Sequence, residues 1–372
     1  MQRVLVAMSG GVDSSVAAAR LVAEGHEVIG VTLHLWDYPD DGTVQGRCCA
    51  PEDVHDAARV AAQIGIAHYS FDRRQLFDSA IVQPFVDAYL SGQTPSPCVH
   101  CNRQVKLREL LSIADRLGAD RVATGHYAQI VERDGRLELH RGIDRSKDQS
   151  YFLHSYLDSA LKRLCFPLGG ATKATIRAEA ARLGLVGAEK GESQELCFVP
   201  TGRYDAFVDG RANGRIRPGK VIDEQGRELG THEGIHRFTL GQRRNLGVAV
   251  GHRVYVTNID ADAGTVTLGE RESLLSDVAM VEAVALTQDL SLPAELDCVV
   301  RYRGEHHRAR VEAVGAEPTD RDPAATGQTG ANPGIARLRI QFQSPVASVV
   351  AGQFAVLYAG DRVMGGGLIV PN

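Results

Sequence analysis

The sequence has no apolar run near the ~18 residues that a membrane-spanning helix needs, and its first residues show neither a basic segment nor a cleavage site typical of a secretory leader. Cysteine is scarce, with seven in 372 residues, and an odd number in a long chain argues against a disulfide framework. The formal net charge of −5 excludes a globally basic nucleic-acid binder and leaves room only for a local basic surface. We therefore expect a cytoplasmic protein, in a reducing compartment, that makes no membrane contact.

The first part of the sequence has the pattern of an α/β protein. The chain is long for a single core, so we expect two or three domains. Residues 1–202 alternate short apolar runs with amphipathic segments, which predicts a doubly wound parallel sheet with helices on both faces. The expected helices are 13–24, 51–64, 75–90 and 103–117, and the expected strands after the first are 28–33, 68–71 and 121–124. Ligands of such sheets bind beyond the carboxyl ends of the strands.

The pattern changes near residue 203. Residues 203–275 are rich in glycine and basic side chains with little helical periodicity, which predicts a basic, β-rich connector domain. Residues 276–372 contain short alternating runs, which predict a small antiparallel β-barrel. The barrel strands are expected at 281–286, 298–303, 336–342, 354–358 and 363–370. The Pro- and Gly-rich residues 315–334 are expected to be a disordered loop.

The strongest motif lies at the start of the chain, where Val4–Met8 predicts a strand and Ser9-Gly10-Gly11-Val12-Asp13-Ser14-Ser15 follows. Glycines and serines remove side-chain bulk where the backbone must come close to a ligand. The amides that begin the next helix point into that gap with the helix dipole behind them, which predicts a phosphate site. Asp13 adds a carboxylate suited to a Mg²⁺ ion that accompanies the phosphates. The loop of the G-x-x-x-x-G-K-[ST] type is excluded, because no lysine follows.

A second motif is Thr94-Pro95-Ser96-Pro97-Cys98-Val99-His100-Cys101-Asn102. Its prolines favour an extended entry, and Asn102 is a suitable cap for the next helix. Cys101 is then expected at a helix N-terminus, where the dipole lowers the pKa of a thiol. Three interpretations stay open: a reactive thiol or metal–sulfur site, a structural zinc site that needs two further close ligands, and buried inert cysteines.

Three weaker features have ordinary structural explanations as well. Cys197, between Leu and Phe, is by itself typical of a core residue. Lys147-Asp148-Gln149 is equally typical of a helix start with a solvated face. Arg243-Arg244 and Arg301-Tyr302-Arg303 place cations in a loop or beside an aromatic ring, as an RNA surface requires, although surface arginines are common.

Taken together, these motifs stand in the order of one known family. S-G-G-V-D-S-S resembles the PP-loop of the N-type ATP pyrophosphatases, which cleave ATP between the α- and β-phosphates. With T-P-x-P-x-x-x-C-N, A-T-G-H-Y-A, K-D-Q-S-Y-F-L, G-E-S-x-x-x-C-F, R-Y-R and G-Q-x-A-V-x-Y, nearly the whole chain resembles the tRNA-specific 2-thiouridylase (MnmA) family. The resemblance implies that ATP adenylates the C2 carbonyl oxygen of the wobble uridine in a tRNA anticodon stem-loop, and that sulfur then displaces AMP. A persulfide or sulfur-relay donor protein is the implied second partner.

The resemblance also implies roles for individual residues. ATP phosphates and their Mg²⁺ would be held by Ala7, Met8, Ser9, Gly10, Gly11, Val12, Asp13 and Ser14, with Leu33 and Gly125 lining adenine and ribose. The implied tRNA contacts are Ser96, Pro97, Cys98, His126, Lys147, Asp148, Gln149, Tyr302, Arg303 and Gln353. Cys101 would be the nucleophile and Cys197 would carry the persulfide, which is a strong, soft nucleophile. The target base must leave its stack to react, at a cost of a few kcal/mol.

One position departs from part of the family, because some members have Asp where this chain has Cys98. Here Cys98, Cys101 and Cys197 are suited instead to be three thiolate ligands of a [4Fe–4S] cluster, with one iron open to bind sulfide. The sequence leaves the persulfide relay and the cluster as equal alternatives.

Two other functions share parts of this pattern. A PP-loop synthetase that adenylates a small acid or amide, for attack by ammonia, would use the same N-terminus but needs no cysteine pair. A non-catalytic tRNA-binding sulfur carrier would use the connector and barrel, but it has no need of Asp13 and a pyrophosphate cradle.

Overall fold

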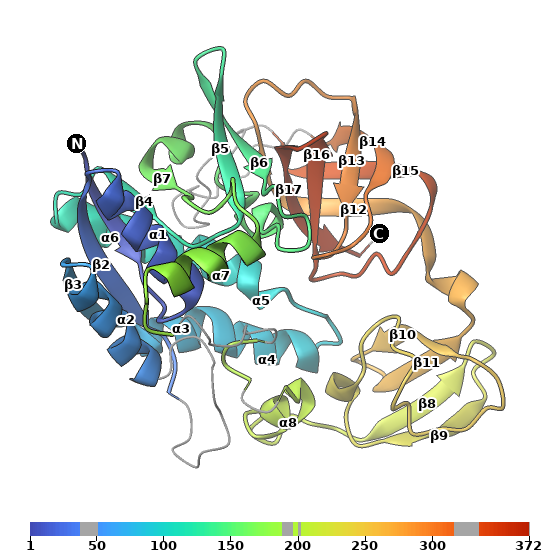
Figure 1. Cartoon of the computed structure of the whole chain (residues 1–372). Helices are drawn as coiled ribbons and strands as arrows, with labels where there is room; N and C mark the ends of the chain where they lie inside the picture. The colour runs from blue at the N-terminus through green and yellow to red at the C-terminus, as the bar shows by residue number, and fades with distance from the viewer. Residues whose placement is uncertain (38–50, 188–195, 200–201, 316–334, 372) are drawn as a thin grey trace.

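The computed structural model describes residues 1–37, 51–187, 196–199, 202–315 and 335–371. Its first sheet is parallel, with the strand order β3-β2-β1-β4-β7, and lies at the left of Figure 1. The strands are β1 (Arg3–Ala7), β2 (Glu27–His34), β3 (Ala67–Asp72), β4 (Arg121–Ala123) and β7 (Leu164–Cys165). The α/β fold class predicted from the alternating pattern is confirmed.

Helices cover both faces of this sheet. Val4 and Val6 of β1 pack in one apolar cluster with α1 (Val12–Ala23), α2 (Pro51–Gln63) and α7 (Lys173–Arg182). Leu5, between those two valines, packs in a different cluster with the helices on the other face. Because successive side chains of a strand point to opposite faces, this division shows a doubly wound sheet.

The second face carries two long helical runs. The first consists of α3 (Arg74–Phe77), a π-helical segment at Asp78–Val82, and α4 (Gln83–Leu90). The second consists of α5 (Pro97–His100), a π-helical segment at Cys101–Lys106, and α6 (Leu107–Arg116). The helix expected from residue 103 therefore begins six residues earlier, after Ser96, and Asn102 lies inside it rather than at its cap. The two prolines therefore mark the start of the helix, with Pro97 as its first residue. They do not mark an extended segment that continues up to Asn102.

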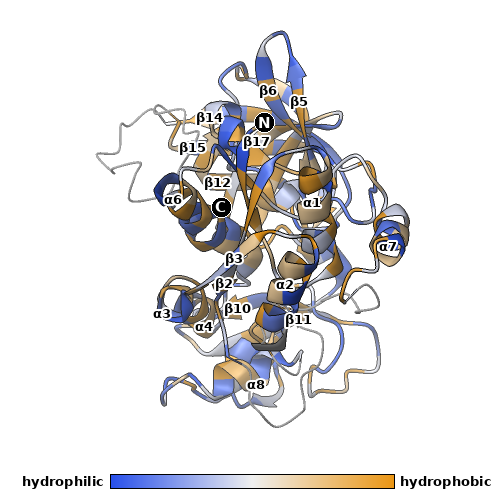
Figure 2. Ribbon diagram, turned by 60° about the vertical axis from the view of Figure 1, so that its left-hand side comes forward, coloured by the Kyte–Doolittle hydropathy of each residue, from blue (hydrophilic) through white to orange (hydrophobic). Residues whose placement is uncertain are grey.

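A hairpin of β5 (Ala128–Arg133) and β6 (Arg136–Arg141) leaves the parallel sheet and joins the barrel. His140 of β6 pairs with Arg362 of the last barrel strand, and the Arg362 guanidinium lies 3.2 Å from Glu138. The tip of the hairpin is hydrophilic (Figure 2). The N-terminal part of the chain and the barrel thus share one sheet.

The middle of the chain forms a separate four-stranded sheet with the order β10-β11-β8-β9, at the lower right of Figure 1. The short helix α8 (Tyr204–Asp209) precedes it. Its strands are β8 (Gly219–Asp223), β9 (Glu228–His232), β10 (Tyr255–Asp260) and β11 (Thr265–Gly269).

The C-terminal part is a closed antiparallel barrel, because the first strand β12 pairs with the last strand β17. The barrel strands are β12 (Leu275–Leu286), β13 (Ala294–Val299), β14 (His307–Val314), β15 (Arg337–Ala347), β16 (Phe354–Ala359) and β17 (Arg362–Val370). The predicted barrel is confirmed, but the strand expected at 298–303 ends at Val299. Nearly all of the loop expected to be disordered (315–334) lies outside the described residues, which leave out 316–334.

Short 3-10 turns complete the described secondary structure, at Ser150–Leu153, Asp158–Arg163, Ile235–Arg237 and Arg271–Leu274. No helix in the described part of the chain is long and apolar enough to cross a membrane.

Candidate active site

The loop of residues 8–11 connects β1 to α1 at the carboxyl end of the sheet. Gly10 has φ +73°, and a Cβ there would lie 2.3 Å from the carbonyl oxygen of Asp53, so only glycine fits. Gly11 is the N-cap of α1, and a glycine has no side chain with which to cap the first amides. Those amides therefore keep the anion-binding geometry of a helix N-terminus.

Ser14 stabilises this loop from inside α1. The backbone N–H of Ser9 donates to Ser14 Oγ at 3.1 Å, and Ser14 Oγ donates to the carbonyl oxygen of Gly11 at 3.0 Å. Ser14 is buried. Its hydroxyl therefore holds the loop closed, which is a structural reason for the serine in the motif.

The carboxylate of Asp13 faces a lysine that the sequence analysis did not select. Lys173 Nζ lies 2.8 Å from Asp13 Oδ1 and 2.7 Å from Oδ2, and the Tyr127 hydroxyl donates to Oδ1 at 2.8 Å. Lys173 is the first residue of α7, after the N-cap Thr172. A cation suited to phosphate thus lies at the loop, and it comes from 160 residues downstream.

Gly125 and His126 lie next to this loop. A Cβ on Gly125 would come within 3.0 Å of the Asp13 carbonyl carbon and of the Ser14 nitrogen, so glycine permits the close approach. Burial lowers the pKa of His126 to about 3, and its Nδ1 lies 2.7 Å from Thr124 Oγ1. His126 is therefore neutral near pH 7. Leu33, the other residue expected to line the adenine, is buried in the apolar cluster of the second sheet face.

Cys98 lies in the first turn of its helical run and is exposed to solvent. Surrounding protein nevertheless raises the pKa of its thiol, and the charge of Lys106 opposes the rise. Lys106 also contributes to the low pKa of His126.

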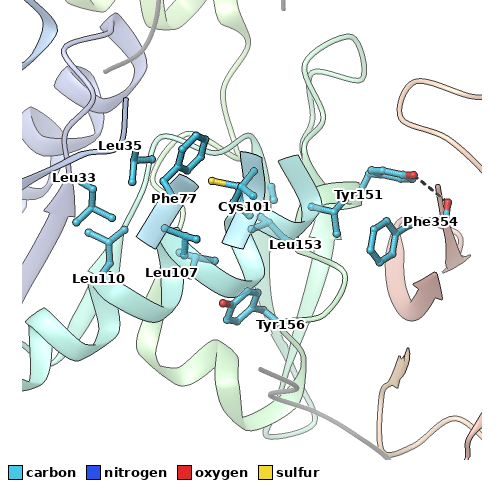
Figure 3. Packing of buried hydrophobic residues seen from close by; sticks show 14 of the residues in the cluster. Leu33, Leu35, Phe77, Cys101, Leu107, Leu110, Tyr151, Leu153, Tyr156 and Phe354 are labelled. Carbon is cyan, nitrogen blue, oxygen red and sulfur yellow. Dashed lines mark hydrogen bonds between the residues drawn. The ribbon is translucent and has the colours of Figure 1, made fainter. Parts of the chain in front are cut away.

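Cys101 is not at a helix N-terminus, and the predicted lowering of its pKa by the helix dipole loses its basis. It lies in the π-helical segment, one turn into the run, and is 5% exposed. Figure 3 shows its sulfur directed toward Phe77, within the apolar packing that also contains Leu107. The π-helical segment turns this cysteine into the core, and such segments are often found at functional sites.

Cys197 is half-buried and packs against the same apolar cluster as Cys101. The next residue, Phe198, is 2% exposed. Its ring centroid lies 5.6 Å from that of Phe77, 5.1 Å from Phe85 and 5.3 Å from Phe207. These rings come from the first long helical run and from α8, so Phe198 anchors the cysteine-bearing segment.

Cys98 is exposed while Cys101 is buried, and no three His, Cys, Asp or Glu side chains in the described ranges are placed to hold a metal ion. The carboxylate of Asp13 is bound by Lys173 and Tyr127. The roles of the three cysteines toward a cluster and of Asp13 toward Mg²⁺ stay predictions.

The expected RNA contacts of the first domain lie in two segments. Ser96 is the N-cap before Pro97. In the second segment, the carboxylate of Asp148 accepts hydrogen bonds from the backbone of Gly142 at 3.0 Å and of Ser150 at 3.1 Å, so this side chain orders its own loop. The roles of these residues toward RNA stay predictions.

The expected barrel contacts lie close to the second segment. Tyr302 and Arg303 occupy a turn after β13, and the Tyr302 ring centroid lies 4.2 Å from that of Phe152. The charges of Lys147 and Asp148 both act on the Tyr302 hydroxyl. The structure therefore brings Lys147, Tyr302 and Arg303 together, as a common RNA surface requires.

Comparisons with known proteins agree along the whole chain. A family profile described as "tRNA methyl transferase HUP domain" matches residues 2–201, "tRNA methyl transferase PRC-barrel domain" matches 206–270, and "Aminomethyltransferase beta-barrel domain" matches 327–369. A tRNA-specific 2-thiouridylase MnmA of Sorangium cellulosum is 56% identical, covering 99% of this chain and 92% of the relative. One from Geobacter metallireducens is 45% identical, covering 99% of this chain and 96% of the relative.

This chain belongs to the tRNA-specific 2-thiouridylase family. Among solved structures, a 4-thiouridine synthetase–RNA complex with bound ATP matches with TM-score 0.36 and 16% identity, over 57% of this chain and 51% of that chain. That likeness is too distant to assign a function.

Sequence analysis did not select Lys173, Tyr127, Lys106 or Phe198 as site residues, although each has a contact or a charge effect at the candidate site. Tyr127 and Phe198 are part of the motifs A-T-G-H-Y-A and G-E-S-x-x-x-C-F, so a signal for them was present. For Lys173 the signal was weak, because Thr172 before it shows only a helix-cap pattern.

Proposed function

We propose that this protein thiolates the C2 position of the wobble uridine of tRNA at the expense of ATP. The observation that carries the proposal is the uncapped N-terminus of α1, with Lys173 at Asp13 and Gly125 in close approach to Asp13 and Ser14. An anion-binding loop with a cation beside it suits ATP phosphates, and Mg²⁺ would enter with that substrate.

A carbonyl oxygen is a poor leaving group, so the C2 oxygen of the uridine must be activated before sulfur can replace it. Attack of the uridine C2 oxygen on the α-phosphate releases pyrophosphate and leaves an adenylate. Sulfur then attacks C2, and AMP leaves with the former carbonyl oxygen. Neutral His126, next to Gly125, is able to donate or accept a hydrogen bond without carrying charge, because burial lowers its pKa to about 3.

We propose that a persulfide on Cys197 supplies the sulfur, delivered to the protein by a sulfur-relay donor. The terminal sulfur leaves Cys197 when a thiolate at Cys101 attacks Cys197 Sγ and forms a bond to it. Cys101 and Cys197 both pack in the same apolar core, which supports this pairing. For the same reason we prefer the persulfide relay to an iron–sulfur cluster. The cycle then needs a reductant for the new sulfur–sulfur bond, which suits a cytoplasmic location.

We also propose a division of labour among three units, at 1–202, 203–275 and 276–372. The first binds ATP and the target base. The connector and barrel provide RNA contacts, with Tyr302, Arg303 and Gln353 as the barrel residues. The RNA contacts of the first unit are Ser96 to Cys98, His126 and Lys147 to Gln149.

The test is reconstitution of thiolation with purified full-length protein, ATP, tRNA and a persulfide donor. We expect 2-thiouridine by mass spectrometry of digested tRNA, one pyrophosphate per thiolation, and no product with Cys197→Ala. Pyrophosphate release driven by a small acid without tRNA would favour the synthetase instead. Sulfur transfer that survives Asp13→Ala would favour a non-catalytic carrier.

A second measurement decides between the persulfide and the cluster. Protein purified without oxygen is expected to be colourless and free of iron, and active with the persulfide donor. A broad absorption band near ~400 nm with about four irons per chain, lost in Cys98→Ala, would assign the sulfur delivery to a cluster.

A further inference from the structure

The carboxylate of Asp13, in the first turn of α1, is held by two donors from different elements. The Tyr127 hydroxyl donates to Oδ1 at 2.8 Å, and Lys173 Nζ lies within 2.8 Å of both oxygens. Tyr127 is 3% exposed, so its hydroxyl has little freedom to move. The orientation of Asp13, and with it of Lys173, therefore depends on where Tyr127 and the start of α7 lie.

Both donors are positioned by one loop, residues 142–149. The side-chain oxygen of Gln149 accepts from the Tyr127 N–H at 3.0 Å, and the Gln149 N–H donates to the Tyr127 carbonyl oxygen at 2.9 Å. Asp144 Oδ2 accepts from the backbone N–H of Lys173 at 2.9 Å. The loop thus holds Tyr127 by two hydrogen bonds and the start of α7 by a third.

The same loop is bound to the barrel on its other side. Arg145 Nη2 donates to Asp361 Oδ2 at 2.6 Å, and Ser150, which orders the loop through Asp148, lies 3.3 Å from the Tyr358 hydroxyl of β16. Lys147 and Asp148 act on Tyr302 of the barrel turn. Loop 142–149 therefore stands between the RNA-facing surface and the ATP loop.

We propose that Tyr127 is a positioning residue that couples docking of RNA on loop 142–149 to the geometry of Asp13 and Lys173, so that ATP is bound and cleaved productively when RNA is in place. The coupling runs along two hydrogen-bonded paths, through Gln149 and Tyr127 and through Asp144 and Lys173, which meet at Asp13. The inference rests on the proposed function, because it takes ATP and tRNA as the two substrates. Coupling of this kind is reciprocal, so ATP strengthens RNA binding by the same factor.

The test uses the full-length protein and the Tyr127→Phe variant, which removes the hydroxyl and keeps the ring and the backbone bonds to Gln149. Affinity for a non-hydrolysable ATP analogue is measured by calorimetry with and without saturating tRNA. We expect tRNA to tighten analogue binding in the wild type by a factor of about 5 to 100. In Tyr127→Phe that factor, which is the ratio of the two affinities, should fall toward one, whatever the affinity for the analogue alone.

Two further variants sharpen the test. Asp144→Ala cuts the second path and is expected to lower the same coupling factor. Tyr69→Phe removes a hydroxyl from the exposed edge strand β3, where Tyr69 is 48% exposed, and should leave the factor unchanged. The melting temperature of each variant reports loss of folding separately from loss of coupling.

The outcomes separate the inference from the function on which it rests. A wild type that thiolates tRNA but shows no coupling, or a Tyr127→Phe protein with the wild-type factor, overturns the inference alone. A wild type that binds neither the ATP analogue nor tRNA overturns the proposed function.

Discussion

The side-chain amide of Gln353 donates a hydrogen bond to the carbonyl oxygen of Thr94 at 2.8 Å, with a second contact to Pro95 O at 3.3 Å. Both acceptors are carbonyl oxygens, so the orientation of the amide is determined. A Cβ on the preceding Gly352 would lie 2.9 Å from the same Thr94 oxygen, so the two segments are in close contact. A barrel residue therefore holds the segment that leads into Cys98.

Gln353→Glu tests this contact. A carboxylate facing two carbonyl oxygens cannot donate and repels them, so the segment before Cys98 should loosen. We expect kcat for tRNA thiolation to fall about 10-fold, which corresponds to roughly 1.4 kcal/mol, and the alkylation rate of Cys98, followed by mass spectrometry, to change without tRNA present. Gln225→Glu, exposed in the connector, is the control. A weaker affinity for tRNA with unchanged kcat would show that Gln353 is only an RNA contact.

Lys173→Met removes the cation beside Asp13, where we propose that the ATP phosphates bind. We expect ATP-dependent pyrophosphate release to fall by at least about 100-fold, as is typical when a charge-stabilising donor is lost, with tRNA affinity within twofold of the wild type. Lys173→Arg should recover part of the activity because the charge remains. Arg182→Met, at the exposed end of the same helix, is the matched control. Wild-type pyrophosphate release in Lys173→Met would exclude a role for this lysine at the phosphates.

Phe198→Ala should free the segment that carries Cys197. Loss of a buried phenyl ring costs about 3–5 kcal/mol of unfolding free energy, measured by urea denaturation, and alkylation of Cys197 should become faster. Phe342→Leu is the control, since Phe342 is buried in the separate barrel cluster. It should lower stability without changing Cys197 reactivity. Equal acceleration in both variants would mean that Phe198 has no local anchoring role.

Acidification should destabilise the protein through buried histidines. Burial lowers the pKa of His154 from 6.5 to about 4, so the unfolded chain takes up this proton at a higher pH than the folded chain. The contribution of the neutral ring is complete above pH 6.5 and is lost as the pH falls from 6.5 toward 4, by at most about 3 kcal/mol. His100 and Arg103 face His154 and oppose its protonation as well.

His154→Gln separates the contribution of His154 to the unfolding free energy from other effects of acid. The unfolding free energy, measured at pH 7.5 and pH 5.0, should change less between the two conditions than in the wild type. Exposed His252, replaced by Gln, should leave the wild-type difference intact. An unchanged difference in His154→Gln would assign the acid sensitivity to other groups.

Local signals predicted the elements that depend on near neighbours in the chain. The strand, glycine turn and helix at the N-terminus, the parallel sheet and the barrel follow from apolar periodicity and from glycine, and all are confirmed. The start of the second helical run was wrong, because Ser96 and Pro97 begin a helix that continues through a π-helical segment past Asn102. No sequence period signals such a segment, since it depends on packing around Cys101.

The glycine-rich loop at Ser9–Gly11 and the membership of the family could be predicted from sequence, because both rest on residues adjacent in the chain. Which side chains meet at that loop depends on how distant segments pack. Lys173 and Asp13 are 160 residues apart, and Gln353 and Thr94 are 259 residues apart. The β5–β6 hairpin joins the barrel although it belongs to the N-terminal part of the chain. Such contacts form because the sheet, the hairpin and the barrel bury apolar surface together, and no local pattern records which polar groups are then brought into hydrogen-bond distance.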